Sequence, residues 1–138
     1  MPPVTDQPGA LDGLRILVVD DDPESLELVA ELLEMNGAEV QRARGVTQAR
    51  EVLLRFRADL VISDLSMPEG DGFDLIMEIR RLPAEAGGDT PAIAFSGSSD
   101  PLSRARALAY GFQEYVPKPV DSFLLVNTVA ALARRATR

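Results

Sequence analysis

Five short runs of mostly apolar residues recur along the chain, and segments with a helical periodicity separate them. Each run ends at polar or turn-forming residues, and the central runs are apolar throughout, which is typical of strands buried on both faces of a sheet. The predicted strands are residues 15–19, 39–41, 60–62, 92–95 and 115–116.

The segments that follow these runs carry apolar residues at the spacing of one face of an α-helix. In the first segment Leu26, Val29, Ala30 and Leu33 fall at i, i+3, i+4 and i+7, and the pattern stops at Asn36. Similar apolar stripes predict four more helices. The residues of these four stripes are Ala49, Val52, Leu53 and Phe56; Leu75, Ile79 and Leu82; Leu102, Ala105 and Leu108; and Leu125, Val129 and Leu132. Alternating strands and helices indicate one α/β domain with a parallel sheet, because parallel strands need crossover connections.

The first 13 residues (MPPVTDQPGALDG) are rich in Pro, Gly and Asp. This composition predicts a flexible leader at residues 1–13, with the domain spanning residues 14–138. The leader lacks the basic start and apolar centre of a signal peptide. The longest uncharged runs, such as residues 122–133, fall short of the ~20 residues that cross a bilayer. We therefore expect a cytoplasmic location.

Composition narrows the chemistry that is available. The chain has 138 residues, 46% hydrophobic and 26% charged, which fits one ordinary globular domain. It contains no cysteine and no histidine, which excludes disulfide frameworks, thiolate zinc sites, catalytic triads and an autophosphorylating histidine. A net charge of −8 argues against nucleic acid or an anionic membrane as the main partner.

Polar side chains collect just beyond the carboxyl ends of the predicted strands. Asp20 and Asp21 follow the first strand, Asp64 follows the third, Ser96 the fourth and Lys118 the fifth. Ligands of open α/β sheets bind at this edge, so residues that are far apart in sequence are expected to converge there.

The three acids indicate a cation site. Asp22 before Pro23 fits a helix N-cap, but Asp20 and Asp21 have no such structural role. If Asp20 and Asp21 lie beside Asp64, each pair of carboxylates repels by roughly 4 kcal/mol at about 4 Å and moderate dielectric. Oxygen ligands alone favour a hard divalent cation, Mg²⁺ or Mn²⁺ in its place.

Ser96 and Lys118 each also have an ordinary structural interpretation. Ser96 opens a turn-like segment, and a single lysine is usually a solvated surface charge. However, Lys118 is the only lysine among 14 basic residues, and prolines flank it on both sides. Carboxylates, a divalent cation, a hydroxyl and an ammonium together suit phosphoryl transfer onto a carboxylate.

With these residues the chain resembles a response regulator receiver domain over about residues 14–134. The motifs that carry the resemblance are residues 16–22 (ILVVDDD), 64–68 (DLSMP) with 71–72 (DG), 96–97 (SG) and 117–119 (PKP). The resemblance implies the flavodoxin-like (βα)5 fold, a doubly wound parallel sheet with strand order 2-1-3-4-5.

The resemblance also implies roles for individual residues. Asp64 becomes the phospho-acceptor, and Asp20, Asp21 and Asp64 hold Mg²⁺ with the backbone carbonyl of Ser66. The backbone N–H groups implied to contact the phosphoryl group are those of Leu65, Ser66 and Gly97.

Ser96 stands at the hydroxyl position of the family, and Lys118 stands at its lysine position, where a cis Lys118–Pro119 bond is common. Tyr115 matches the switch aromatic that follows the hydroxyl inwards, although from composition alone a half-buried strand tyrosine is the simpler interpretation. The family more often has Thr at Ser96 and Ala at Gly97. The resemblance places Ser66 and Ser98 at positions that, in the family, tune how fast the phosphoryl group is lost.

The expected phosphoryl donor is a histidine kinase or a histidine phosphotransfer protein. The downstream partner is expected to be a protein bound at the face made by the fourth helix, fifth strand and fifth helix. We expect no enzymatic activity beyond the chain's own phosphorylation and dephosphorylation.

Several alternatives remain open from the sequence. Residues 11–15, 83–90 and 111–113 look like those of receivers in hybrid histidine kinases, so the domain could be excised from one. A Mg²⁺-dependent aspartyl phosphatase would want a second Asp where Ser66 stands. A receiver that serves only as a binding platform and a flavin-binding protein are further alternatives, and the flavin alternative lacks a phosphate-binding loop after the first strand.

Overall fold

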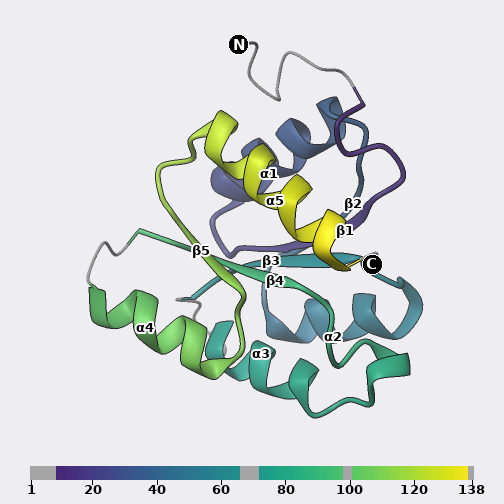
Figure 1. Ribbon diagram of the computed structural model, residues 1–138, viewed down its shortest axis with the longest axis vertical. Helices are drawn as coiled ribbons and strands as arrows, with labels where there is room; N and C mark the ends of the chain where they lie inside the picture. Colours follow the sequence, from purple (N-terminus) through teal and green to yellow (C-terminus); the bar gives the residue numbers. More distant parts are fainter. Residues whose placement is uncertain (1–8, 66–71, 98–100, 137–138) are drawn as a thin grey trace.

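One parallel sheet of five strands forms the centre of the molecule (Figure 1). The computed structural model describes residues 9–65, 72–97 and 101–136. The strands are β1 (Arg15–Val19), β2 (Glu39–Ala43), β3 (Leu60–Asp64), β4 (Ala92–Ser96) and β5 (Glu114–Pro117). Their order is β2-β1-β3-β4-β5, and every neighbouring pair is parallel. The flavodoxin-like strand order that the resemblance implied is therefore confirmed.

Helices cover both faces of the sheet (Figure 1). On one face lie α1 (Pro23–Met35) and α5 (Ser122–Ala136), and on the other lie α2 (Val46–Arg55), α3 (Gly72–Arg80) and α4 (Pro101–Tyr110). A short 3-10 helix, η2 (Ala84–Ala86), follows α3. None of the helices in the described part of the chain combines the length and the apolar character needed to cross a membrane.

The core is divided by the sheet into two clusters of apolar side chains. Because side chains alternate along a strand, Ile16 and Val18 of β1 face the α1 and α5 cluster, while Leu17 and Val19 face the cluster beneath α2, α3 and α4. β1 and β3 are thus buried on both sides, as their continuous apolar runs predicted.

α1 follows its sequence pattern closely. Its four stripe residues are buried, and Pro23 stands at the start of the helix. The side chain of Asp22 accepts a hydrogen bond from the Glu24 N–H at 3.2 Å, which confirms the N-cap interpretation.

The apolar stripe predicted for α4 is wrong, although the helix itself is present. Leu102 is 76% exposed and Leu108 is 41% exposed, and Ala107 alone among the residues of this fully described helix is buried. α4 contacts β5 at the edge of the sheet and α3 beside it, so a small alanine provides the close contact. The larger leucines are left facing outward.

The part of the predicted leader that the structure describes packs against the domain. Leu11 is buried in the α1 and α5 cluster, and its N–H donates to the Asn36 carbonyl at 2.8 Å. The Asp12 carboxylate lies where a Cβ on Gly37 would have to be, and Gly37 has a φ of +102°. Packing therefore begins before residue 14, and the predicted boundary at that residue stays a prediction.

We expect Leu11→Ala to lower the free energy of unfolding by about 3 kcal/mol, because it leaves a cavity beneath α1. Urea denaturation of the full chain measures this value. Leu54→Ala is the matched control, since Leu54 is 88% exposed and its truncation should change stability by less than about 0.5 kcal/mol. Equal effects of the two substitutions would show that residues 9–13 do not contribute to the core.

Candidate functional site

The carboxyl ends of four neighbouring strands bring the predicted polar residues together. Asp20 directly follows β1, Asp64 and Ser96 are the last residues of β3 and β4, and Lys118 directly follows β5. The Lys118 Nζ lies 3.0 Å from Asp20 Oδ2 and 3.4 Å from Asp64 Oδ2. The lysine thus bridges two acids that are 44 positions apart in the sequence.

Three carboxylates form a compact cluster beside this lysine. Asp20, Asp21 and Asp64 each contribute one carboxylate oxygen, and these three oxygens all lie within 4.8 Å of one another. Asp20 and Asp64 are buried, while Asp21 is half-buried. Asp20 Oδ1 accepts the Asp22 N–H at 3.0 Å, and the buried Oδ2 lies 3.0 Å from the Lys118 ammonium. A buried carboxylate oxygen of this kind, next to two further acids, fits the oxygen ligands of a hard divalent cation.

Lys118 keeps its charge although it is partly buried. Desolvation lowers its pKa, but the hydrogen bond and the attraction from Asp20, with a further contribution from Asp64, outweigh burial. The net result is a Lys118 pKa above its ordinary value. The ammonium also lies 5.3 Å from the centre of the Phe95 ring, a contact that sequence reasoning did not anticipate.

The backbone around Lys118 is tied to the neighbouring strand. The Lys118 N–H donates to the Ser96 carbonyl at 2.8 Å, and the Lys118–Pro119 bond is cis, as the resemblance implied. Ser96 is buried, so the hydroxyl, the lysine and the acids share one protected edge of the sheet.

Gly72 has a role that its motif did not reveal. It begins α3 and donates its N–H to the Leu65 carbonyl at 3.1 Å. A Cβ at Gly72 would collide with the backbone carbonyl oxygen of Asp64, so only glycine fits this approach. Ser63 adds a second restraint, because its Oγ donates to the same carbonyl at 2.8 Å. The sequence signal was present for Gly72 in the Asp-Gly pair, but nothing in the pattern indicated Ser63.

The remaining predicted residues are distributed as follows. Tyr115 is 7% exposed in the cluster beneath α2, α3 and α4, so it is more buried than the half-buried strand tyrosine of the simpler interpretation. Leu65 is buried and Gly97 is exposed. Ser66 and Ser98 lie outside the described residues, as do positions 67, 68 and 71 of the motifs.

Comparison with known proteins identifies the family. The family model for the response regulator receiver domain matches residues 16–130. An uncharacterized 14.6 kDa protein in the sodA1 3' region of Leptolyngbya boryana is 43% identical over 119 residues, which cover 86% of this chain and 89% of that protein. The transcriptional regulatory protein CpxR of Klebsiella pneumoniae subsp. pneumoniae is 36% identical over 88% of this chain and 50% of that protein. The chain therefore spans about half the length of this regulator.

A solved structure agrees in fold and in sequence. The signal receiver domain of a signal transduction histidine kinase from Syntrophus aciditrophicus superimposes with a TM-score of 0.82 at 31% identity, covering 91% of this chain and 94% of that one. Together with the acidic cluster at the strand ends, these likenesses establish that the chain belongs to the family of response regulator receiver domains of two-component systems.

Proposed function

We propose that Asp64 is the residue that accepts the phosphoryl group, from a histidine kinase or a histidine phosphotransfer protein. The observation that supports this most strongly is the buried Asp64 carboxylate at the strand ends, 3.4 Å from a charged lysine and within 4.8 Å of two further acids. A new O–P bond to Asp64 forms as the N–P bond of the donor breaks, and the departing imidazole nitrogen takes up a proton.

Asp20, Asp21 and Asp64 are the side chains proposed to hold Mg²⁺, or Mn²⁺ in its place, with the Ser66 carbonyl as a further ligand. When bound, the cation neutralises negative charge on the carboxylates and on the phosphoryl oxygens. Lys118 would supply a second positive charge, 3.4 Å from Asp64 Oδ2. The backbone N–H groups of Leu65, Ser66 and Gly97 are proposed to orient the phosphoryl oxygens.

Ser96 and Tyr115 are proposed to transmit phosphorylation to the surface. Both are buried, and they lie on the neighbouring strands β4 and β5. The phosphoryl group would draw the Ser96 hydroxyl towards it, and the space released would let the Tyr115 ring change position.

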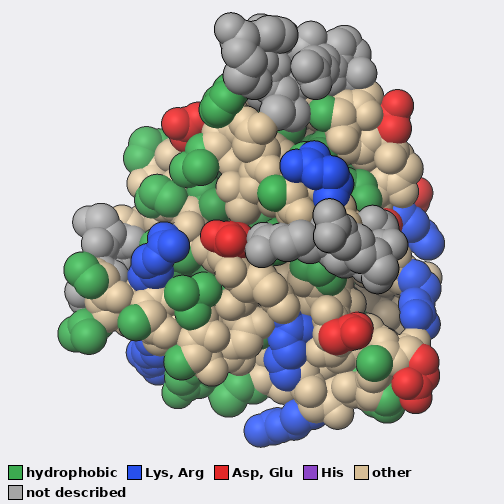
Figure 2. Space-filling model, in the orientation of Figure 1, with side chains coloured by type: hydrophobic (Ala, Val, Ile, Leu, Met, Phe, Trp, Pro, Cys, Tyr) green, Lys and Arg blue, Asp and Glu red, His purple; other side chains and the backbone are tan. Residues whose placement is uncertain are grey.

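The face made by α4, β5 and α5 is proposed to bind the downstream protein. Figure 2 shows hydrophobic side chains gathered over α4 and around the start of α5, with basic side chains among them. The exposed apolar residues of this face are Leu102, Leu108, Tyr110, Phe123 and Leu124. With a single buried residue, α4 can shift at low cost in packing.

Arg106 links α4 to the start of α3. Its guanidinium lies 4.3 Å from the centre of the Phe73 ring and 5.5 Å from that of Tyr110. Phe73 directly follows Gly72, so this stacking offers a route from the backbone of Asp64 to α4.

The domain bounds 14–138, the cytoplasmic location and the absence of nucleic-acid or membrane partners remain predictions from the sequence.

Incubation with acetyl phosphate and Mg²⁺ should add one phosphoryl group to the chain, measured as intact mass. Asp64→Asn and removal of the metal with a chelator should each abolish the gain, because one removes the acceptor and the other the neutralising charge. Asp21→Asn should reduce it, while Asp22→Asn is the matched control and should not, since asparagine also caps a helix. A gain of mass in Asp64→Asn would contradict the proposal.

Gly72→Ala should slow phosphorylation by at least about tenfold, because its Cβ displaces the backbone that carries Asp64. Gly45→Ala is the control, since Gly45 is not one of the site residues, its backbone is extended and a Cβ there meets nothing within 4 Å. Initial rates of phosphorylation, with circular dichroism to verify folding, measure the difference. Equal rates in the two variants would show that the contact between Gly72 and Asp64 does not position the acceptor.

Tyr115 should change its solvent exposure when beryllofluoride, a phosphoryl mimic, is bound. Fluorotyrosine NMR in a Tyr110→Phe background observes Tyr115 alone, since the chain has two tyrosines. Ser96→Ala should suppress the change, because it removes the hydroxyl that the mimic attracts. The switch hypothesis is wrong for this chain if the Tyr115 signal is the same with and without the mimic.

A further inference from the structure

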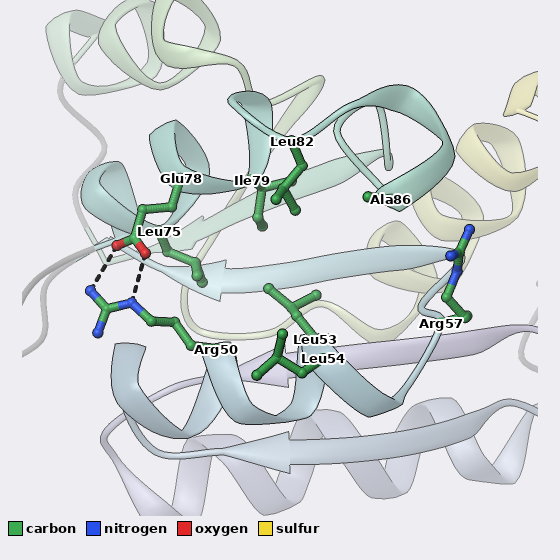
Figure 3. A pocket seen from close by; sticks show the side chains of 9 residues that line it. All are labelled: Arg50, Leu53, Leu54, Arg57, Leu75, Glu78, Ile79, Leu82 and Ala86. Atoms are coloured by element: carbon green, nitrogen blue, oxygen red, sulfur yellow. Dashed lines mark hydrogen bonds and ion pairs between the residues drawn. The ribbon is translucent and has the colours of Figure 1, made fainter.

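A groove of about 430 Å³ runs between α2 and α3 (Figure 3). Neither the three acids nor any described residue of α4, β5 or α5 lines it. Its floor is made by Leu75 and Ile79 of α3, which are almost completely buried. Its rim carries Leu54, which is 88% exposed, and Leu82, which is 41% exposed. Leucines from two segments therefore face one another across an apolar channel.

The exposed rim indicates a protein partner rather than a small molecule. Exposed apolar side chains that converge on a groove are typical of interaction sites. A small ligand could fill the channel, but it would leave most of Leu54 in water. A helix laid along the groove would cover Leu54 and Leu82 together, and docking of amphipathic helices into such grooves is a common mode of recognition.

Charge differs between the two ends of the groove. At one end Arg50 and Glu78 neutralise each other through two hydrogen bonds of 2.6 and 2.8 Å (Figure 3). At the other end the Arg57 guanidinium donates to the Glu85 backbone carbonyl at 2.7 Å. Asp89 lines an adjoining hollow, yet among the described residues no carboxylate forms an ion pair with Arg57. Arg57 therefore offers an exposed positive charge that no carboxylate of the described residues pairs with, in a chain whose net charge is −8.

We propose that this groove docks an amphipathic helix of a partner protein, with apolar side chains against the leucines and an acidic side chain at Arg57. The partner is distinct from the one proposed for the α4, β5 and α5 face, because the two surfaces lie on different elements. A second copy of this chain is the competing occupant, which would fill the groove with a different surface of its own. Such a heterologous contact builds a ring or an open-ended chain of molecules rather than a two-fold dimer.

The test uses the full, unphosphorylated, isotope-labelled chain and two synthetic helical peptides. Both peptides carry leucines at i, i+3, i+4 and i+7, and they differ in having Glu or Lys at the polar positions. The Glu peptide should bind about tenfold more tightly or better, with NMR shift changes confined to residues 50–57 and 75–86. No phosphorylation is involved, so the result is independent of the role proposed for Asp64.

Three variants test which side chains of the groove are responsible for binding. Leu54→Ser should weaken binding of the Glu peptide at least about tenfold, because it removes the rim contact. Arg57→Gln should abolish the preference for Glu over Lys. Arg55→Gln is the matched control, since Arg55 is also an exposed arginine at the end of α2 but does not line the groove. This variant should behave as the parent chain does.

Other outcomes would overturn the proposal. The groove is not a docking site if neither peptide binds at about 1 mM or if the shift changes fall on α4 and α5. The assigned role of Arg57 is wrong if Arg55→Gln and Arg57→Gln have equal effects. Sedimentation velocity of the chain alone would reveal self-association, and if Leu54→Ser abolished that self-association, the occupant would be a second copy instead of a partner helix.

Discussion

The ion pairs of Lys118 with Asp20 and Asp64 are the interaction on which the site depends. Two carboxylates of like charge lie buried at adjacent strand ends, and their repulsion is strong where water is excluded. A single ammonium between them offsets that repulsion, and an oxygen of Asp21 lies within 4.8 Å of oxygens of both acids. The site is therefore held in a shape that can accept a cation and a phosphoryl group.

This constraint explains much of the architecture around the site. Lys118 reaches both acids although β3 and β4 lie between β1 and β5, because its long side chain extends across the strand ends. The loop that carries it is restrained by two prolines and by the hydrogen bond to the Ser96 carbonyl. Gly72 approaches the carbonyl of Asp64 closely and the Ser63 hydroxyl donates to it, so Asp64 is restrained through its backbone as well as through its side chain.

The helices on the two faces differ in how firmly they are held. α1 buries four residues in a core that also includes α5 and Leu11, whereas α4 buries one alanine and relies on stacking of Arg106 with Phe73 and Tyr110. α4 is thus held by fewer buried side chains at the edge of the sheet, whereas Leu75 and Ile79 on the floor of the α2 and α3 groove are almost completely buried.

Much of the fold was determined by the sequence alone. Alternating apolar runs and helical stripes defined the strands and helices, and the motifs identified the acids, Ser96 and Lys118 before any distance was known. These signals are local, since each depends on spacing along one element or on residues adjacent to a strand end. The tertiary structure decided which face of α4 is buried, that Leu11 belongs to the core, and that Gly72, Ser63 and Phe95 restrain the site. Those features arise from contacts between segments distant in sequence, and no periodicity along one element can encode them.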